Sequence, residues 1–359
     1  MSRGTKAIIN INNLKHNFKV LSDLAPAKLV LVVKADAYGH GLKHIVSALD
    51  DADCFGVATI DEALTIKQVR SDARILLLEG FLNNDELKTA FDNDFDCVIH
   101  QDQQLDMLDN ISTAKKMNIW LKYDSGMNRL GFTDRQYQAA ISRLDKHDRV
   151  KEIILMSHLA CADLKQNNFT AIQTERFLKL KTRQQVSLSN SSALLNKDHL
   201  TDEWCRVGLA LFGVSPIAGT CAADYNLKAV MALKTNVIAI KQVDAGQGIG
   251  YSQKYKAQTD MKIAIIGIGY GDGFPWSLSQ GAFVKLKNHK ATIVGRVSMD
   301  MIAIDITAIE NVELGDSVLI WGEDEDSQLP LETLASHANT IPYVLLCQIT
   351  SRVHYQYDN

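Results

Sequence analysis

The chain has 359 residues, of which 46% are hydrophobic and 22% are charged, and its formal net charge is -4 at pH 7. This balance is typical of a globular protein and gives no sign of a nucleic-acid or membrane-surface partner. A chain of this length usually forms two domains. The first residues lack the apolar core of a signal peptide, which predicts a cytoplasmic location. The six scattered cysteines predict reduced core residues, with neither disulfides nor a metal site.

The first 215 or so residues alternate between helical and strand-like patterns. A helical repeat (14–24) precedes a continuous apolar run at 29–35, which is typical of a strand buried on both faces. Seven more strand-like runs follow, at 54–59, 75–80, 95–100, 118–124, 152–160, 185–190 and 204–213. Helical stretches lie between most of them, at 42–50, 61–70, 84–92, 102–110, 134–145 and 168–182. Eight strands in unbroken alternation predict a (β/α)8 TIM-type barrel over residues 1–223, in preference to an open doubly wound sheet.

From about residue 224 onward the pattern becomes one of β-strands. Strand-like runs occur at 230–243, 261–270, 282–295, 301–307 and 316–322, and turns rich in Gly, Asp and Asn separate them. One late helix is expected at 331–338. These features predict a second, mostly β domain over residues 224–359. The expected fold class is therefore α/β, with an N-terminal barrel followed by a mostly β C-terminal domain.

Polar and charged side chains stand where the barrel strands end, which is where the active sites of such barrels form. They are Lys34, Glu79, His100, Lys122, His158, Asn190 and Arg206. One such residue would be ordinary, because strand ends reach solvent. Several cations and imidazoles at one end of a barrel predict a site for an anionic ligand.

Lys34 ends the first apolar run of the barrel, within the stretch VVKADAYGHG at 32–41. A lysine amine that is partly shielded from water can act as a nucleophile and form a Schiff base with a carbonyl cofactor. Further along, Asn190-Ser191-Ser192 opens a short helix, and Gly208 allows a close approach to the backbone. A helix start and a bare backbone after the seventh and eighth strands suit the phosphate of such a cofactor.

The stretch at 32–41 resembles the pyridoxal-phosphate motif of the alanine racemases. The resemblance covers nearly the whole chain, in the same order as the two predicted domains. It includes WLKYDSGMNRLG (120–131), MSHLACAD (156–163), RVGLALFGVSP (206–216), GIGYS (248–252), GYGDGFPW (269–276) and VGRVSMDM (294–301). The resemblance implies a homodimer that interconverts L- and D-alanine with pyridoxal 5'-phosphate. The product would supply D-alanine for cell-wall peptidoglycan, or the enzyme would serve alanine catabolism.

The resemblance also implies catalytic roles for matching residues. Lys34 would bind the cofactor covalently and act as one base, and Tyr251 from the partner subunit would be the other. Arg206 would face the pyridine nitrogen, where an arginine keeps its own proton and leaves the ring nitrogen unprotonated. His158 would lie against the ring, and a cationic neighbourhood of His158 and Arg206 would help Tyr251 to act as a base.

The remaining roles implied by the resemblance concern binding. The residues expected to bind phosphate are Tyr38, Ser191, Gly208 and Leu209. The residues expected to bind substrate are Arg129 and Met299, with Tyr270 and Asp300 in support. Ser351 stands where many relatives have a phosphate-contacting tyrosine, so we assign it no contact.

Lys122 leaves two alternatives open. Relatives often carry a carbamylated lysine at this position, whose negative charge would orient Arg129. Otherwise Lys122 is an ordinary lysine, balanced by Asp124 or by a bound anion.

Three other functions compete with racemisation of alanine. The β domain and Tyr251 argue against a single-domain pyridoxal-phosphate carrier. No motif matches the catalytic cysteine of the related two-domain decarboxylases. The third alternative, a racemase with a broader or different amino-acid preference, is not separated from an alanine racemase by the sequence.

Overall fold

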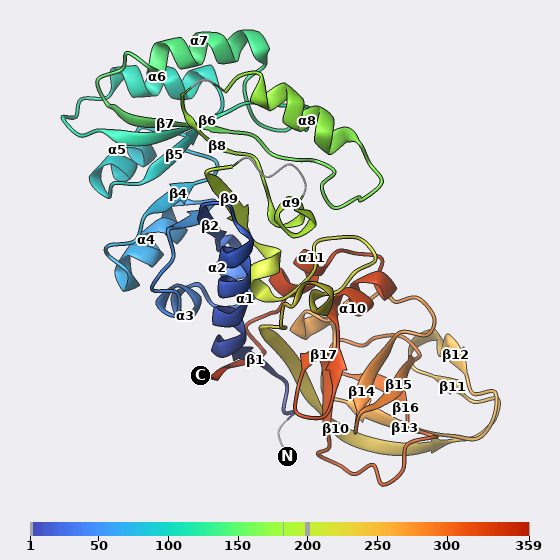
Figure 1. The fold of residues 1–359 in the computed structure, drawn as a ribbon. Helices are drawn as coiled ribbons and strands as arrows, with labels where there is room; N and C mark the ends of the chain where they lie inside the picture. The colour runs from blue at the N-terminus through green and yellow to red at the C-terminus, as the bar shows by residue number, and fades with distance from the viewer. Residues whose placement is uncertain (1–2, 182, 198–201, 359) are drawn as a thin grey trace. The chain divides into compact units, whose positions relative to one another are not determined.

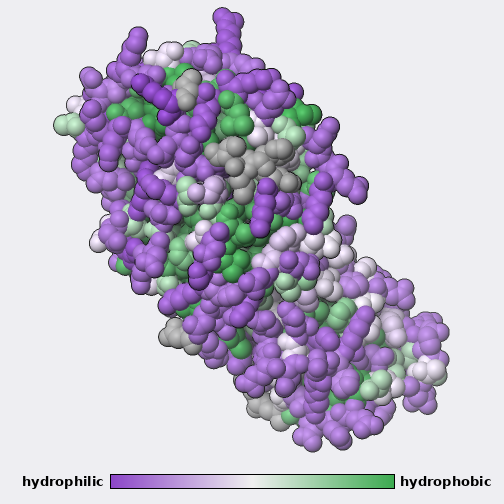
Figure 2. Space-filling model, viewed as in Figure 1, coloured by the Kyte–Doolittle hydropathy of each residue, from purple (hydrophilic) through white to green (hydrophobic). Residues whose placement is uncertain are grey.

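The structure, a computed structural model, describes residues 3–181, 183–197 and 202–358. The chain divides into two compact units. One unit, the barrel unit, contains Asn17–Leu211 and Ser215–Gly219, and the other, the β unit, contains Met1–His16, Phe212–Val214 and Thr220–Asn359. The face drawn in Figure 2 is mostly hydrophilic. Among the described residues, no helix has both the length and the apolar character needed to span a membrane.

The barrel unit is built on eight parallel strands. In spatial order these are β8 (Gln185–Ser187), β7 (Val150–Met156), β6 (Met117–Lys122), β5 (Asp96–Ile99), β4 (Ile75–Leu77), β3 (Cys54–Val57), β2 (Lys28–Val32) and β9 (Trp204–Val207). The circle nearly closes between β8 and β9. There the Ser187 hydroxyl donates to the Trp204 carbonyl at 2.7 Å, and the Arg206 amide donates to the Ser189 carbonyl at 3.0 Å. The predicted barrel is confirmed.

Helices lie outside these strands (Figure 1). They are α1 (Ile11–Leu24), which crosses between the two units, then α3 (Leu42–Ser47), α4 (Ile60–Val69), α5 (Asn84–Asp92), α6 (Asp102–Asn110), α7 (Asp134–Leu144), α8 (Phe169–Leu178) and α9 (Ser191–Asn196). Each lies within a few residues of a stretch with a helical pattern or a predicted helix start. The strands end somewhat earlier than predicted, because their apolar runs continue into buried loops.

Side chains from seven of the eight strands fill the barrel interior. They are Val30, Cys54, Leu76, Val98, Trp120, Ile154, Met156 and Trp204, each at most 2% exposed. Trp120 and Trp204 meet edge to face with ring centroids 5.4 Å apart. At the N-terminal ends of the strands the Asp96 carboxylate accepts from Trp120 Nε1 at 2.9 Å and pairs with Arg74 at 2.7 Å. This packed interior leaves the C-terminal strand ends as the place for a ligand.

The β unit is built on a nine-stranded sheet. Its spatial order is β18 (Gln328–Leu329), β17 (Ser317–Glu323), β14 (Phe283–Leu286), β15 (His289–Val294), β16 (Ile302–Asp305), β13 (Met261–Ile266), β10 (Met231–Val243), β1 (Lys6–Asn10) and β19 (His354–Asp358). A hairpin of β11 (Gly248–Ile249) and β12 (Tyr255–Lys256) stands apart from this sheet. The predicted mostly β domain is confirmed.

The first sixteen residues differ from the predicted division of the chain at 223. They were expected in the barrel, but β1 pairs antiparallel with β10 and parallel with β19, so they belong to the β unit. Late in the chain α10 (Leu331–His337) occupies the predicted helix position. A second helix, α11 (Pro342–Cys347), was not predicted, because its short apolar run has no clear helical period.

Candidate active site

Lys34 lies two residues beyond the end of β2 and begins α2 (Lys34–Gly39), a short turn with left-handed backbone angles. The next four residues, Ala35 to Tyr38, have φ angles of 53° or 54°. This left-handed conformation raises the free energy of an L-residue by roughly 1–2 kcal/mol. Such a conformation persists where the surrounding structure holds it, and it is found mostly at functional sites. The turn that joins Lys34 to Tyr38 is therefore a candidate part of a functional site.

Tyr38, Ser191 and Gly208 come together at one place in the barrel unit. The Gly208 amide donates to the Ser191 hydroxyl at 3.0 Å. A Cβ atom added at Gly208 would lie 2.4 Å from the Tyr38 hydroxyl oxygen, so only glycine allows this approach. Leu209 follows, buried, at the start of a 3-10 turn. Two hydroxyl groups beside a bare backbone form a cradle with the donors that a phosphate group needs.

Arg206 in β9 is held firmly inside the barrel, with 4% of its surface exposed. Its Nη1 donates to the Ser187 hydroxyl at 2.5 Å, and its Nη2 donates to the Ser157 carbonyl at 2.6 Å. Burial lowers the pKa of Arg206 to about 10, an effect that the charge of Asp202 opposes. Arg206 therefore keeps its proton at neutral pH.

His158, in the loop after β7, lies beside Arg206. Its Nδ1 is 3.1 Å from Nη2 of Arg206. A guanidinium group can only donate, so Nδ1 accepts and the ring proton is on Nε2. Burial, and then the charge of Arg206, hold the pKa of His158 well below its ordinary value. The prediction that His158 adds positive charge near Tyr251 is therefore wrong, because the ring is neutral.

Lys122 ends β6 and is 6% exposed. Burial, and then the charges of Arg206, Arg129 and Lys34, lower the pKa of its amine to about 8. Asp124 acts in the opposite direction. A narrow gap beside these groups, too tight to hold a water molecule, is lined by Lys122, Tyr123, Asp124, Met127, Arg129, Leu130, Ser157 and His158. The structure thus brings the predicted cations together, and their mutual repulsion favours a negatively charged ligand.

These residues fit pyridoxal 5'-phosphate. The hydroxyl cradle of Tyr38 and Ser191 suits its phosphate, and a buried guanidinium suits a ring nitrogen that carries no proton. Lys34 supplies an amine in the same cluster of charges. Among the described residues, no group of three His, Cys, Asp or Glu side chains is arranged to hold a metal ion.

The predicted residues of the β unit lie on exposed turns. Tyr251 begins a 3-10 turn (Tyr251–Gln253) and is 69% exposed, and Tyr270 begins another (Tyr270–Asp272). Met299 is also exposed. Two backbone hydrogen bonds join the turn of Tyr270 to the segment of Met299. The Tyr270 amide donates to the Ser298 carbonyl, and the Gly271 amide donates to the Met299 carbonyl.

A charge network holds the turn of Tyr270 and the neighbouring segment of Met299, and the sequence interpretation missed it. The carboxylate of Asp272, fully buried, accepts from Arg3 Nη2 at 2.5 Å and pairs with Arg352 at 3.3 Å. Arg352 also donates to the Asp300 carboxylate at 2.5 Å, and Arg3 donates to the Asp300 carbonyl at 3.0 Å. Asp300 is thus tied into the framework of the unit. Ser351, beside Arg352 in the chain, is exposed.

Sequence reasoning also missed three polar residues around the barrel site. Gln173 in α8, fully buried, donates to the His158 carbonyl at 3.1 Å and accepts from the Ala160 amide at 2.8 Å. His40 and Glu62 contact the left-handed turn. The pattern Thr-x-x-Glu at 59–62 was a readable signal for a helix cap, but not for its contact with the turn.

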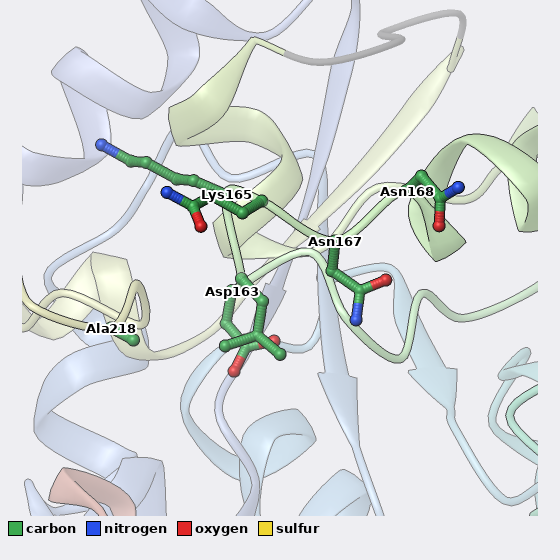
Figure 3. Close-up of a pocket in the computed structure, with 7 residues that line it drawn as sticks. Asp163, Lys165, Asn167, Asn168 and Ala218 are labelled. Atoms are coloured by element: carbon green, nitrogen blue, oxygen red, sulfur yellow. The ribbon is translucent and has the colours of Figure 1, made fainter.

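An open hollow of about 670 Å³ lies on the loop that precedes α8. Its lining residues are Asp163, Leu164, Lys165, Gln166, Asn167, Asn168 and Ala218. Figure 3 shows the Lys165 side chain extending away from Asp163 and Asn167. No residue predicted for the site is among those that line the hollow, so we distinguish it from the cradle.

Comparison with known proteins gives a consistent result for both units. Residues 9–216 match the family described as alanine racemase, N-terminal domain, and residues 230–357 match alanine racemase, C-terminal domain. An alanine racemase of Shewanella piezotolerans is 41% identical over 352 residues, which is 97% of each chain. An alanine racemase of Vibrio vulnificus is 40% identical over 360 residues, 99% of each chain.

Solved structures of alanine racemases are also similar to this chain. The biosynthetic alanine racemase from Pseudomonas aeruginosa matches with a TM-score of 0.95 and 36% identity, over 100% of both chains. Alanine racemase from Bartonella henselae with covalently bound pyridoxal phosphate matches with a TM-score of 0.88 and 29% identity, over 99% of this chain and 100% of that one. The fold and these relatives together define a two-domain barrel enzyme. The chain belongs to the alanine racemase family, a family of isomerases.

Proposed function

We propose that the protein interconverts L-alanine and D-alanine, with pyridoxal 5'-phosphate bound covalently to Lys34. The observation that carries the proposal is the meeting of three features at one end of the barrel. These are the amine of Lys34, the hydroxyl cradle at Gly208, and the buried pair of Arg206 and His158. Family membership supports the same reaction.

The barrel residues hold and orient the ligand. The hydroxyl groups of Tyr38 and Ser191 and the backbone at Gly208 and Leu209 would bind the phosphate. Arg206 would face the pyridine nitrogen, and its proton stays on the guanidinium because its pKa remains well above neutrality. The neutral ring of His158 would lie against the cofactor. When bound, the cofactor draws electrons from Cα of the amino acid and makes its proton acidic.

Racemisation needs a base on each face of Cα, because a proton leaves from one face and returns on the other. The amine of Lys34 would hold or release the proton on the D-alanine face. The hydroxyl of Tyr251 would do so on the L-alanine face. We propose that Tyr251 comes from the partner subunit of a homodimer. The exposure of Tyr251, Tyr270 and Met299 fits a surface that a partner covers.

Negative charge beside Lys122 would complete the site. Several cations surround its amine, and its pKa of about 8 leaves part of the amine uncharged at neutral pH. An uncharged amine can take up carbon dioxide as a carbamate, and a bound anion would supply the same charge. Either would orient Arg129 toward the carboxylate of the substrate, with Met299, Tyr270 and Asp300 completing the substrate side.

A racemisation assay over a panel of L- and D-amino acids tests this function. We expect alanine to be converted in both directions and other amino acids to react much more slowly. Conversion of serine or lysine at the rate of alanine would instead identify a racemase of another or a broader preference. Borohydride treatment followed by peptide mapping should place the cofactor on Lys34, and finding it on another lysine would reject the proposed site.

The cellular role has two alternatives, supply of D-alanine for peptidoglycan and alanine catabolism. Deleting the gene separates them, since a strain that then needs D-alanine to grow depends on the biosynthetic role. A strain that only fails to grow on alanine as carbon source indicates catabolism. The cytoplasmic location stays a prediction from the sequence.

A further inference from the structure

The turn after β2 follows a left-handed course that its own residues do not favour. Ala35, Asp36, Ala37 and Tyr38 all have positive φ, and Gly39 is the one residue of the run that adopts it readily. Contacts from outside the run must therefore hold it. Two side chains that the reaction does not use, those of His40 and Glu62, make such contacts.

His40 closes the end of the turn. It is fully buried, and its Nδ1 lies 3.0 Å from the Ala37 carbonyl oxygen and 2.9 Å from that of Tyr38. Because a carbonyl oxygen can only accept, Nδ1 carries the ring proton and donates to both. Burial lowers the pKa of His40 to about 4, so the ring is neutral at physiological pH. His40 thus fixes the carbonyl groups of Ala37 and Tyr38 in the left-handed run.

Glu62 holds the start of the same run. Its Oε1 accepts from the Ala35 amide at 2.7 Å, directly after Lys34. Its Oε2 accepts from the amides of Ala58 at 2.9 Å and Thr59 at 3.3 Å, at the beginning of α4. All three partners are donors, so both carboxylate oxygens are needed. Glu62 thereby ties the first residue of the turn to a helix of the barrel.

The two ends of this turn carry the groups that meet the ligand. The amine of Lys34 lies at its start, and Tyr38 at its end places a hydroxyl beside Gly208. We propose that His40 and Glu62 are positioning residues for the cofactor. By holding the left-handed turn, they keep Lys34 and Tyr38 aimed at one bound pyridoxal phosphate. This inference rests on the proposed function.

Two substitutions at His40 show whether its hydrogen bonds to the turn matter, or only the space that its side chain fills. Asparagine places an amide N–H near the position of Nδ1, whereas glutamine carries it one carbon further. Cofactor-free protein is titrated with pyridoxal 5'-phosphate, and the dissociation constant is read from protein fluorescence. We expect His40→Gln to raise the dissociation constant about tenfold or more, and His40→Asn to stay within about threefold of the unsubstituted protein.

A second pair of substitutions, at Glu62 and Thr59, separates the effect of holding the turn from the effect of capping α4. Glu62→Gln replaces one accepting oxygen with an NH2 group, which can only donate and therefore faces a backbone N–H without forming a hydrogen bond. This change should weaken cofactor binding about tenfold. Thr59→Ala removes the bond from the Glu62 amide to the Thr59 hydroxyl, at 3.2 Å, but leaves the carboxylate on Ala35. It destabilises the same helix start, so it is the matched control, and it should leave the dissociation constant unchanged.

Urea midpoints of the cofactor-free proteins show which variants fold. If His40→Gln does not fold, the pair of Glu62→Gln and Thr59→Ala decides. Normal affinity in both His40→Gln and Glu62→Gln would overturn the inference. So would equal weakening by His40→Asn and His40→Gln, or by Thr59→Ala and Glu62→Gln, because packing alone would then explain the loss. If the unsubstituted protein binds no cofactor, the proposed function fails together with this inference; if it binds and the variants match it, only this inference fails.

Discussion

Nη2 of Arg206 lies 3.1 Å from Nδ1 of His158, and this contact sets the charge of the site. The guanidinium donates, so the imidazole accepts and stays neutral. Positive charge in this part of the barrel therefore sits on arginine and lysine side chains. A flat neutral ring next to a buried cation suits an aromatic ligand whose nitrogen carries no proton.

The first prediction concerns this pair. Arg206→Gln removes the charge and should raise the pKa of His158, because the charge of Arg206 is the second cause that lowers it. Burial, the largest cause, remains, so the pKa should stay below its ordinary value. Titration of the ring by NMR in histidine-labelled protein measures the change. Arg183→Gln, at an exposed arginine, is the control. An unmoved pKa would show that Arg206 does not control His158.

Lys122 should make stability depend on pH. Its folded pKa of about 8 lies below the unfolded value of 10.5, so its charge penalises the folded state at pH 7. The penalty disappears as pH rises from about 8 through 10.5. In buffer free of carbon dioxide, Lys122→Met should raise the free energy of unfolding of the cofactor-free protein by roughly 1–3 kcal/mol at pH 7, and by little above pH 10.5.

Urea unfolding at several pH values measures this gain. Lys88→Met, on the exposed face of α5, controls for the loss of a lysine. A loss of stability at pH 7 in Lys122→Met would mean that the charge of Lys122 is already balanced within the protein.

Tyr251→Phe should slow proton exchange at one face of the substrate Cα, the face of L-alanine. The change keeps the ring and deletes the hydroxyl, so cofactor binding should be unchanged. In deuterated water, exchange of the Cα proton of L-alanine should fall roughly 100- to 10,000-fold, while exchange of D-alanine through Lys34 persists. Tyr255→Phe, in the same hairpin region, should leave both rates intact. Equal, mild effects on the two enantiomers would argue that Tyr251 is not a base.

The proposed homodimer makes a prediction that single variants cannot test. Lys34→Ala and Tyr251→Phe should each be inactive, but mixing them after reversible dissociation should restore activity. In a mixed dimer one site receives both defects and the other receives neither. Random pairing makes half of the dimers mixed, so roughly a quarter of the sites should recover. No recovery, with mixed dimers shown to form, would indicate that each chain carries its own complete site.

The sequence predicts the barrel well because buried parallel strands leave a direct pattern. The run of Leu29 to Val33 is apolar without interruption, and such runs alternate with helices eight times. The place of β1 was not predictable in this way. Lys6 pairs with Lys234 and with His354, and nothing in a five-residue strand indicates partners so distant in the chain.

The sequence predicts candidate residues for the site, but not the backbone that carries them. Lys34 and Arg206 are visible because charged residues are unusual at the ends of apolar runs. The left-handed turn is not visible, because Ala35 and Ala37 have no preference for positive φ. The neutrality of His158 and the role of His40 depend on burial and on partners that only the folded chain supplies.

In the proposed function, Lys34 with its cofactor moves the Cα proton of alanine. The most direct measurement follows L-alanine with the protein and pyridoxal 5'-phosphate in deuterated water. We expect D-alanine to form with deuterium at Cα, and Lys34→Ala to lower the rate by roughly a thousandfold or more. Absence of D-alanine, or an undiminished rate in Lys34→Ala, would contradict it.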